Sequence, residues 1–196
     1  MVISEKYLEK YSDEKLMDLI LKGNSVALKI IYMRYNLSIY NFVVRYTGNR
    51  EIAEDILQET FTRVWYAAHT FDKSKGKFKS WLFTIGLNIT RNEMKKKRYA
   101  YNYVGIENTD EDNHEFNHNE NEQPEVILEN AERKKIIYEA LGELKPYLRE
   151  VIVLKHYNQL KFREIAEITK TPEGTLKARF QKAIIQLKEK LESVEI

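Results

Sequence analysis

Cysteine is absent from this chain of 196 residues, so disulfide frameworks and thiolate zinc sites are excluded. Seven glycines and three prolines are few for this length, and long stretches carry no turn signal, which favours an all-helical protein. No apolar run approaches the ~18 residues that a membrane helix needs, and the opening residues MVISEKYLEKYSDEK are too polar for a signal peptide. We therefore expect a soluble, cytoplasmic protein with no direct membrane insertion.

Helical periodicity dominates both ends of the chain. Between them, from Tyr99 to Glu132, lysine and arginine are absent and the run GIENTDEDNHEFNHNENEQPE is rich in acids and asparagine. Such a segment buries too little apolar surface to offset its ordering entropy. The sequence predicts an all-α protein of two small helical domains, 1–98 and 131–196, joined by a flexible acidic linker over 99–130. The helices are expected near 13–22, 25–47, 51–69, 78–98, 131–142, 146–157, 161–168 and 172–193, with Gly23-Asn24 and Gly48-Asn49 separating the first three.

An acidic helix, AEDILQETFTRVW at residues 53–65, stands out in a chain of net charge +2. On a helical wheel its outward face carries acids and glutamine, and Phe61 and Trp65 lie at the border with the core face. Acids repel DNA, whereas acids beside large aromatic side chains suit a docking patch for a basic protein surface. The same pattern also fits a solvated face with both aromatic rings tucked into the core. The outward acids and amide are Glu54, Asp55, Gln58 and Glu59.

The predicted fourth helix has a basic side. Its polar residues recur at spacings of three and four along one line, and a lysine-rich loop precedes it. Cations in this arrangement suit a phosphate backbone, and asparagine and arginine could also contact bases. Phe71, Phe78 and Trp81 could stack on an unstacked base, although a solvated basic helix end would look the same. The residues are Lys73, Lys75 and Lys77 in the loop and Thr84, Asn88, Arg91, Lys95 and Arg98 in the helix.

A helix-turn-helix is predicted at 162–183, FREIAEITKTPEGTLKARFQKA. Pro172 suits the first position of the second helix, with Thr171 as its cap. A small residue flanked by donors and cations on the outward face suits a major-groove helix, while a helical hairpin with a solvated basic face is the alternative. Thr175, Ala178, Arg179 and Lys182 point outward, and Leu176, Phe180, Ala183, Ile184 and Leu187 form the buried stripe.

A plain DNA-binding regulator and an enzyme or metalloprotein are the two alternative classes of function. A plain DNA-binding regulator would use the helix-turn-helix alone and would need neither the acidic face nor a second basic helix. The sequence gives little support for an enzyme or metalloprotein, because it has no glycine-rich phosphate loop and no nucleophile motif. His114 and His118 have metal-ligand spacing and Asp110–Asp112 is acidic, but both lie in the predicted linker. We expect no catalysis, no cofactor and no metal.

Taken together, these motifs resemble the bacterial RNA polymerase sigma factors of the sigma-70 family, extracytoplasmic-function (ECF) type. That family's polymerase-binding motif is similar to AEDILQETFTRVW. The rest of its first domain resembles VALKIIYMRY at 26–35 and FKSWLFTIGLNITRNEMKKKR at 78–98. Its promoter-reading helix resembles EGTLKARFQKA at 173–183. The chain departs from the family where Lys170 replaces a usual glycine and Thr171 a usual β-branched apolar residue.

The resemblance implies a transcription initiation factor that binds core RNA polymerase and promoter DNA. Region 2 (1–98) would bind polymerase and the −10 element, which it would help to melt. Region 4 (131–196) would read the −35 element and touch the polymerase flap. An anti-sigma factor, of a kind that is often membrane-bound, would inhibit it. The implied polymerase contacts are Asp55, Gln58 and Glu59, flanked by Phe61 and Trp65. The implied −10 contacts are the loop and helix residues given above. The implied −35 contacts are Glu173, Thr175, Lys177, Ala178, Arg179 and Lys182.

Overall fold

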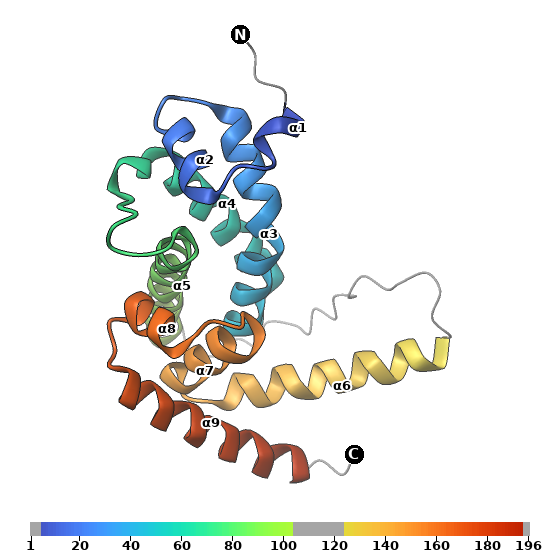
Figure 1. The fold of residues 1–196 in the computed structure, drawn as a ribbon. Coiled ribbons are helices and arrows are strands. Elements are labelled where there is room, and N and C mark those ends of the chain that lie inside the picture. The colour runs from blue at the N-terminus through green and yellow to red at the C-terminus, as the bar shows by residue number, and fades with distance from the viewer. Residues whose placement is uncertain (1–4, 104–123, 194–196) are drawn as a thin grey trace.

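A computed structural model of the protein describes residues 5–103 and 124–193 (Figure 1). All regular secondary structure in these residues is helical, which confirms the all-α prediction. The N-terminal unit contains α1 (Glu5–Leu8), α2 (Asp13–Ile20), α3 (Ser25–Thr47), α4 (Arg50–Tyr66), the 3₁₀ turn η1 (Ala68–Thr70) and α5 (Phe78–Tyr103). The C-terminal unit contains α6 (Pro124–Glu143), α7 (Pro146–Ile152), the π-helical turn η2 (Val153–Tyr157), α8 (Phe162–Thr169) and α9 (Glu173–Ser193).

Two helices extend beyond the predicted domain boundaries. The α5 helix continues to Tyr103 instead of ending near residue 98, and α6 begins at Pro124 instead of near 131. Proline is well suited to the first helical position because its missing N–H has no partner there in any case. The histidines and acids weighed as metal ligands, at 110–118, lie outside the described residues.

Two Gly-Asn pairs set the helix boundaries of the N-terminal unit, as predicted. Gly48 ends α3 with φ of 72°, in the left-handed region that glycine adopts without steric cost. Asn49 then starts α4, since its side-chain oxygen accepts a hydrogen bond from the Ile52 N–H at 2.8 Å. Asn24 starts α3 in the same way, accepting from Ala27 at 3.0 Å.

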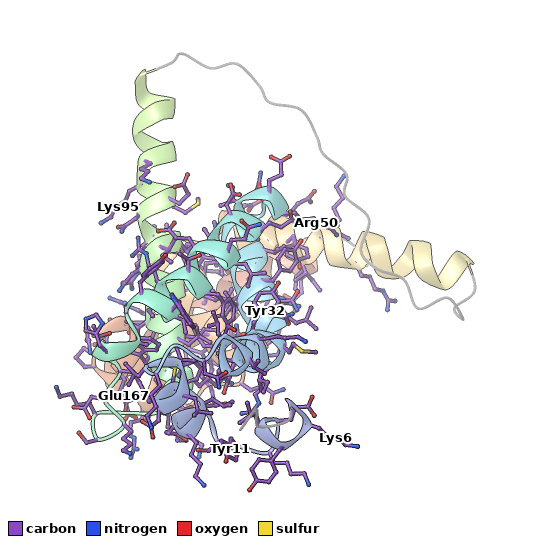
Figure 2. All side chains as sticks on the ribbon, turned by 90° about the horizontal axis from the view of Figure 1, so that it is seen from above. Lys6, Tyr11, Tyr32, Arg50, Lys95 and Glu167 are labelled. Atoms are coloured by element: carbon purple, nitrogen blue, oxygen red, sulfur yellow. The ribbon has the colours of Figure 1, made fainter. Side chains whose placement is uncertain are left out.

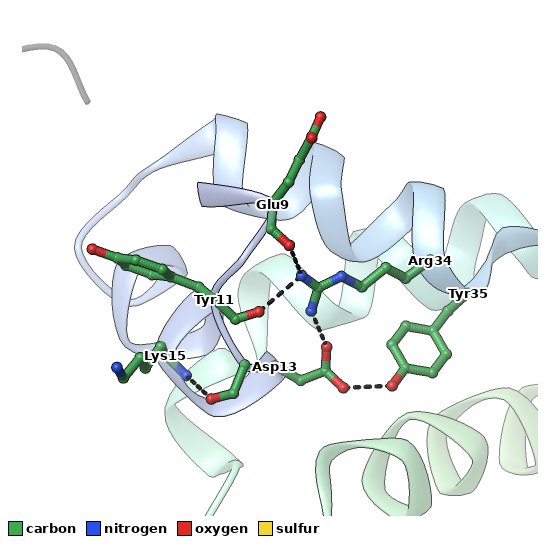
Figure 3. Close-up of polar contacts among 7 residues, drawn as sticks. Glu9, Tyr11, Asp13, Lys15, Arg34 and Tyr35 are labelled. Carbon is green, nitrogen blue, oxygen red and sulfur yellow. Dashed lines mark hydrogen bonds and ion pairs between the residues drawn. The ribbon is translucent and has the colours of Figure 1, made fainter. Parts of the chain in front are cut away.

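The first two helices are fixed to α3 by a polar cluster (Figure 3). The Arg34 guanidinium donates to the Asp13 carboxylate at 2.6 Å and to the backbone carbonyls of Glu9 and Tyr11 at 2.6 and 2.8 Å. The Tyr35 hydroxyl donates to the same carboxylate at 2.5 Å. Burial, and then this hydrogen bond, raise the pKa of the Tyr35 phenol. One arginine thereby supplies hydrogen-bond donors to two backbone carbonyls in the segment between α1 and α2.

The core of the N-terminal unit lies among α3, α4 and α5. Phe42 of α3 and Phe83 of α5 are fully buried, with their ring centroids 5.8 Å apart in an edge-to-face arrangement. Each such side chain contributes about 1.5–3 kcal/mol through removal of its apolar surface from water. This packing fixes the orientation of α5, and with it the direction of that helix's polar face.

The helix-turn-helix of the C-terminal unit forms as predicted, with one strained turn residue. Lys170 ends α8 with φ of 57° and ψ of 34°, the left-handed conformation that glycine adopts at lower steric cost than lysine. The Thr171 hydroxyl donates to the Thr169 carbonyl at 3.4 Å, so its hydrogen bond lies at the end of α8 and not at the start of α9. The Pro172 carbonyl accepts from the Leu176 N–H at 3.0 Å, and α9 follows from Glu173.

The two units pack against each other (Figure 1). The α8 helix lies beside α5, and the C-terminal half of α3 contacts α6, α7 and η2. Buried residues of both units, among them Phe42, Phe83, Val153 and Ile165, belong to one continuous apolar cluster. Within the ranges that the structure describes, no helix is both long and apolar enough to cross a membrane.

Candidate functional site

The acidic surface of α4 is exposed. Its core face is buried as the wheel predicted, with Ala53, Ile56 and Val64 at most 2 % exposed. Glu59 accepts from Arg63, one turn later, at 2.5 Å. The outward residues Glu54, Asp55, Gln58 and Glu59 all face solvent, and we call this set the acidic surface.

The two aromatic residues beside the acidic surface differ in exposure. Phe61 is 6 % exposed and packs edge-on against Tyr32 of α3, with ring centroids 4.9 Å apart. Trp65 is half-buried. Tyr32, which is 39 % exposed, lies over Phe61, so α3 also contributes an aromatic ring beside α4. Sequence reasoning missed Tyr32 because it belongs to a different helix from the motif.

The loop before α5 is a lysine-rich turn built on Asp72. The Ser74 hydroxyl and backbone N–H both donate to one Asp72 oxygen, at 2.7 and 2.9 Å, and Lys75 lies 3.4 Å from the other. The hydrogen bonds from Ser74, with Lys75 nearby, lower the pKa of the Asp72 carboxyl. With the turn held in this way, the side chains of Lys73, Lys75 and Lys77 are exposed.

The polar line of α5 is only partly exposed. Asn88 and Lys95 face solvent, whereas Thr84 and Arg91 are half-buried. The side chain of Arg98 lies outside the described part of the structure. Figure 2 shows Lys95 on the stretch of α5 that projects beyond the neighbouring helices.

The aromatic residues near the loop form a cluster. Phe78 is 1 % exposed and belongs to the core, so its ring contributes packing. Phe71 and Trp81 are half-buried, with ring centroids 5.5 Å apart. Of the three rings proposed to stack on a base, these two retain exposed surface.

Two carboxylates of the C-terminal unit pair with cations of α5 and of the loop before it. Glu150 of α7, which is 4 % exposed, accepts two hydrogen bonds from Arg91, at 2.9 and 2.7 Å. Glu164 of α8 accepts from Lys77 at 3.1 Å. Sequence reasoning missed both carboxylates. Glu150 did leave a signal, because a single acid within the buried run LREVIVL requires a cationic partner.

The outward face of α9 is exposed in this arrangement. Thr175, Lys177, Ala178 and Lys182 face solvent, and Arg179 is half-buried. The Arg179 guanidinium lies over the Tyr147 ring, 5.2 Å from its centroid. Glu173, in the first turn of α9, is also half-buried. The structure therefore brings the six predicted −35 residues together on one accessible helix end.

An apolar groove runs along the opposite side of α9. Ile184 was predicted to be buried but is 43 % exposed, because the groove between α6, η2 and α9 leaves it uncovered. The groove encloses about 830 Å³. At 100° per residue, Ile184 lies half a turn from Thr175, so the groove faces away from the outward face. Its lining includes Ile137, Leu141, Ile152, Tyr157, Ile184 and Leu187.

Across 5–103 and 124–193, no group of three or more histidines, aspartates or glutamates is placed to hold a metal ion.

Comparison with known families matches both units. The family model of Sigma-70 region 2 matches residues 31–105. The family model described as "Sigma-70, region 4" matches residues 134–187. The chain is 31 % identical over 181 residues to the ECF RNA polymerase sigma factor SigW of Bacillus subtilis, covering 91 % of this chain and 96 % of that protein. It is 25 % identical to the ECF RNA polymerase sigma-E factor of Escherichia coli K12, covering 89 % and 92 %.

Two solved structures share the fold. CnrH, in complex with the cytosolic domain of CnrY, has a TM-score of 0.68 at 23 % identity and covers 92 % of this chain and 97 % of its own. RpoE of Bartonella quintana, in complex with the anti-sigma factor NepR, has a TM-score of 0.65 at 23 % identity and covers 84 % and 96 %. The order of the units, the motifs in each and the SigW identity agree: the chain belongs to the ECF RNA polymerase sigma factors, transcription initiation factors that direct polymerase to promoters.

Proposed function

We propose that the acidic surface of α4 binds core RNA polymerase, that α5 and its loop bind the −10 element, and that α9 reads the −35 element. The observation that carries this proposal is the separation of charge: an exposed acidic surface on α4, in the same chain as the basic residues of the loop before α5, of α5 itself and of α9. A protein that only bound DNA would gain nothing from exposed acids beside its basic face, because they weaken attraction to phosphates.

The polymerase contact centres on Asp55, Gln58 and Glu59. Their side chains are exposed on one face of a helix whose other face is fully packed, so the contact surface is rigid before binding. Trp65 and Tyr32 supply aromatic surface beside the acids, while Phe61 supports Tyr32 from the core. The basic counterpart on polymerase would pair with the carboxylates and steer the encounter.

The −10 contact combines Lys73, Lys75 and Lys77 with the polar line of α5. The lysines suit the phosphate backbone, and Asn88 and Arg91 offer hydrogen bonds to exposed bases. Binding an extruded base offsets the few kcal/mol needed to unpair it, so this surface would favour the melted promoter. The half-exposed rings of Phe71 and Trp81 are suited to stacking on such a base.

The −35 contact is the N-terminal half of α9. Ala178 allows close approach to the floor of the major groove, and Arg179 and Lys182 reach bases or phosphates on either side. The Tyr147 ring beneath Arg179 restricts that side chain before DNA arrives. Glu173 is placed to accept from a base amino group, and Thr175 and Lys177 lie beside it on the exposed helix end.

The apolar groove behind α9 is suited to the flap contact of polymerase. Because the groove faces away from the DNA-reading side, the C-terminal unit can bind DNA and a protein segment at the same time. Its lining of isoleucine, leucine and tyrosine suits the apolar face of a helix.

We also propose inhibition by an anti-sigma factor, since the solved relatives CnrH and RpoE were captured with the partners CnrY and NepR. The chain would act in the cytoplasm, where polymerase and DNA are found, and would itself catalyse nothing. The bond-forming chemistry would belong to polymerase.

A pull-down with core RNA polymerase tests this proposal against the plain DNA-binding regulator. The purified chain, tagged at one end, should retain core polymerase at physiological salt. Absence of binding, with the chain shown by circular dichroism to be folded, would eliminate the sigma-factor mechanism.

A further inference from the structure

Arg179 differs from other cations of the C-terminal unit in the kind of group that holds it. Within residues 5–103 and 124–193 it makes no ion pair with a carboxylate, whereas Arg163 and Lys190 each pair with a glutamate. Its guanidinium carbon lies 5.2 Å from the centroid of the Tyr147 ring, within the range of a cation–π contact. An aromatic ring on α7 therefore holds a charged side chain on α9.

The backbone positions of both partners are fixed by the core of the C-terminal unit. Tyr147 lies in the first turn of α7 and directly precedes Leu148, which is fully buried. Arg179 directly precedes Phe180, whose ring packs edge-on against an aromatic ring of α8 with centroids 5.8 Å apart. Leu148 and Ala183 of α9 belong to one apolar cluster, which joins the two helices. The ring and the guanidinium are therefore placed relative to each other before DNA binds.

The contact with the ring leaves the hydrogen-bonding capacity of Arg179 unused. A ring attracts the cation through its quadrupole, whereas a carboxylate takes up N–H donors in a two-bond pairing. The N–H groups of a guanidinium lie in its plane and form a rigid fork of donors. Arg179 is only half-buried, so these donors remain accessible. The side chain is thus restrained in position and still able to donate.

Arg179 lies on the side of α9 that the proposed function turns toward DNA. At about 100° per residue it is about 40° from Thr175, which lies one turn earlier on the outward face. A fork of donors matches the O6 and N7 acceptors of guanine in the major groove. The exposed Lys177 and Lys182 have no such fork, and their compact charges suit phosphates. Arg179 is therefore the side chain of this face best suited to read a base.

We propose that Tyr147 is a positioning residue for base recognition: its ring holds Arg179 so that the guanidinium reads O6 and N7 of a guanine in the −35 element. This inference rests on the proposed role of α9, to which it adds a residue from another helix and the identity of one base. A side chain restrained before binding loses less rotamer freedom when it binds. Other sequences do not form the two bonds, so removal of the ring should reduce discrimination between bases.

Two substitutions separate the Tyr147 ring from the rest of the side chain. Tyr147→Phe keeps the ring, and the hydroxyl that it removes has no hydrogen-bond partner within the described residues. Tyr147→Leu keeps an apolar side chain but removes the π face. Tyr147 is 40 % exposed, so neither change opens a cavity in the core, and thermal melts check that both variants fold.

The experiment measures binding of the holoenzyme, core polymerase with the chain, to duplex fragments that carry a promoter mapped by run-off transcription. Each guanine of the −35 element, on either strand, is replaced in turn by 7-deazaguanine, which keeps the base pair but lacks the N7 acceptor. With the parent chain, replacement at one position should weaken binding by about fivefold or more. Arg179→Ala should show no further weakening at that position.

The two Tyr147 variants should then differ. Tyr147→Phe should respond to the analogue like the parent. Tyr147→Leu should bind the unmodified promoter about threefold more weakly and respond to the analogue by about twofold or less. The slope of log K against log salt should be unchanged in both, because both keep the charge of Arg179.

Two further variants keep the test decisive. Arg179→Lys keeps the charge but not the fork, so it should also lose the response to the analogue although Tyr147 is unchanged. If Tyr147→Leu melts below the assay temperature, Tyr147→Met removes the ring with an unbranched side chain and is expected to give the same result.

Several results would overturn the inference. They are a −35 element without guanine, a response to the analogue that Arg179→Ala leaves intact at every position, a ringless variant that responds like the parent, and equal losses in Tyr147→Phe and Tyr147→Leu. Failure of the proposed function would look different, because scrambling the whole −35 element would then leave holoenzyme binding unchanged.

Discussion

Reversing the charge at Asp55 and Glu59, both to arginine, is expected to abolish tight binding to core polymerase while leaving the fold intact. Both side chains are exposed on α4, and the packed face of that helix is unaffected. Glu59 loses its contact with Arg63, an i,i+4 pair worth about 0.3–0.5 kcal/mol, and the introduced arginine repels Arg63 by a similar amount. The total cost in stability is about 1 kcal/mol, which lowers Tm by about 2–4 °C in a protein of this size.

The expected loss in binding is much larger. Central charged residues of an interface cost about 2 kcal/mol or more each when removed, and reversal adds repulsion from the basic partner surface. Two such residues correspond to about a thousandfold weaker binding, at 1.4 kcal/mol for each factor of ten. Titration of a fluorescently labelled chain with core polymerase, with a thermal melt of each variant, separates affinity from stability.

A control with the same change in net charge is available away from α4. Asp18 of α2 and Glu189 of α9 are both exposed, and their reversal to arginine should leave polymerase affinity within about threefold of the parent, through long-range charge alone. If the Asp55 and Glu59 double variant keeps the affinity of this control while remaining folded, the assignment of the acidic surface is refuted.

Three further predictions concern the C-terminal unit. Lys170→Gly should raise stability by about 1 kcal/mol in a urea titration, because glycine adopts φ of 57° without steric cost; a lower midpoint would contradict the strain. Replacing Arg179 and Lys182 with alanine should weaken binding to −35 DNA and reduce the slope of log K against log salt by about 2, and an unchanged slope would argue against phosphate contact. Burial would raise the pKa of Glu164, but the Lys161 N–H and Lys77 outweigh burial and lower it. A lowered pKa stabilises the fold fully above the unfolded value of about 4.3, and this stabilisation is lost progressively as the pH falls from there through the lower, folded value. The Tm of the parent should therefore exceed that of Glu164→Gln by a constant amount from about pH 5 to 8, and this difference should shrink as the pH is lowered below about 4.

The helices of each unit could be predicted from the sequence because their signals are local. Gly48 followed by Asn49 specifies the end of one helix and the start of the next, and the structure shows both caps. The acidic surface of α4 also follows from periodicity alone, since Ala53 and Ile56 are buried where the wheel places them. Helix capping and the 3.6-residue period depend only on residues that are close in the sequence, so distant residues are not needed to predict them.

The interface between the units could not be predicted in this way. Nothing near Arg91 in the sequence indicates Glu150, and the two meet only because α7 packs against the end of α3. The exposure of Ile184 has the same origin, because the groove that uncovers it depends on where α6 lies. The buried position of Glu150 was visible in the sequence as an acid within an apolar run, but its partner was not.

Run-off transcription with core polymerase tests the central assignment most directly. Core enzyme should be incubated with duplex genomic fragments, with the chain added or omitted, and transcripts mapped by their 5′ ends. The account predicts discrete transcripts that require the chain, share sequence elements near −10 and −35, and disappear with the Asp55 and Glu59 reversal. Transcripts that are absent, or that persist unchanged with the reversal variant, would contradict it.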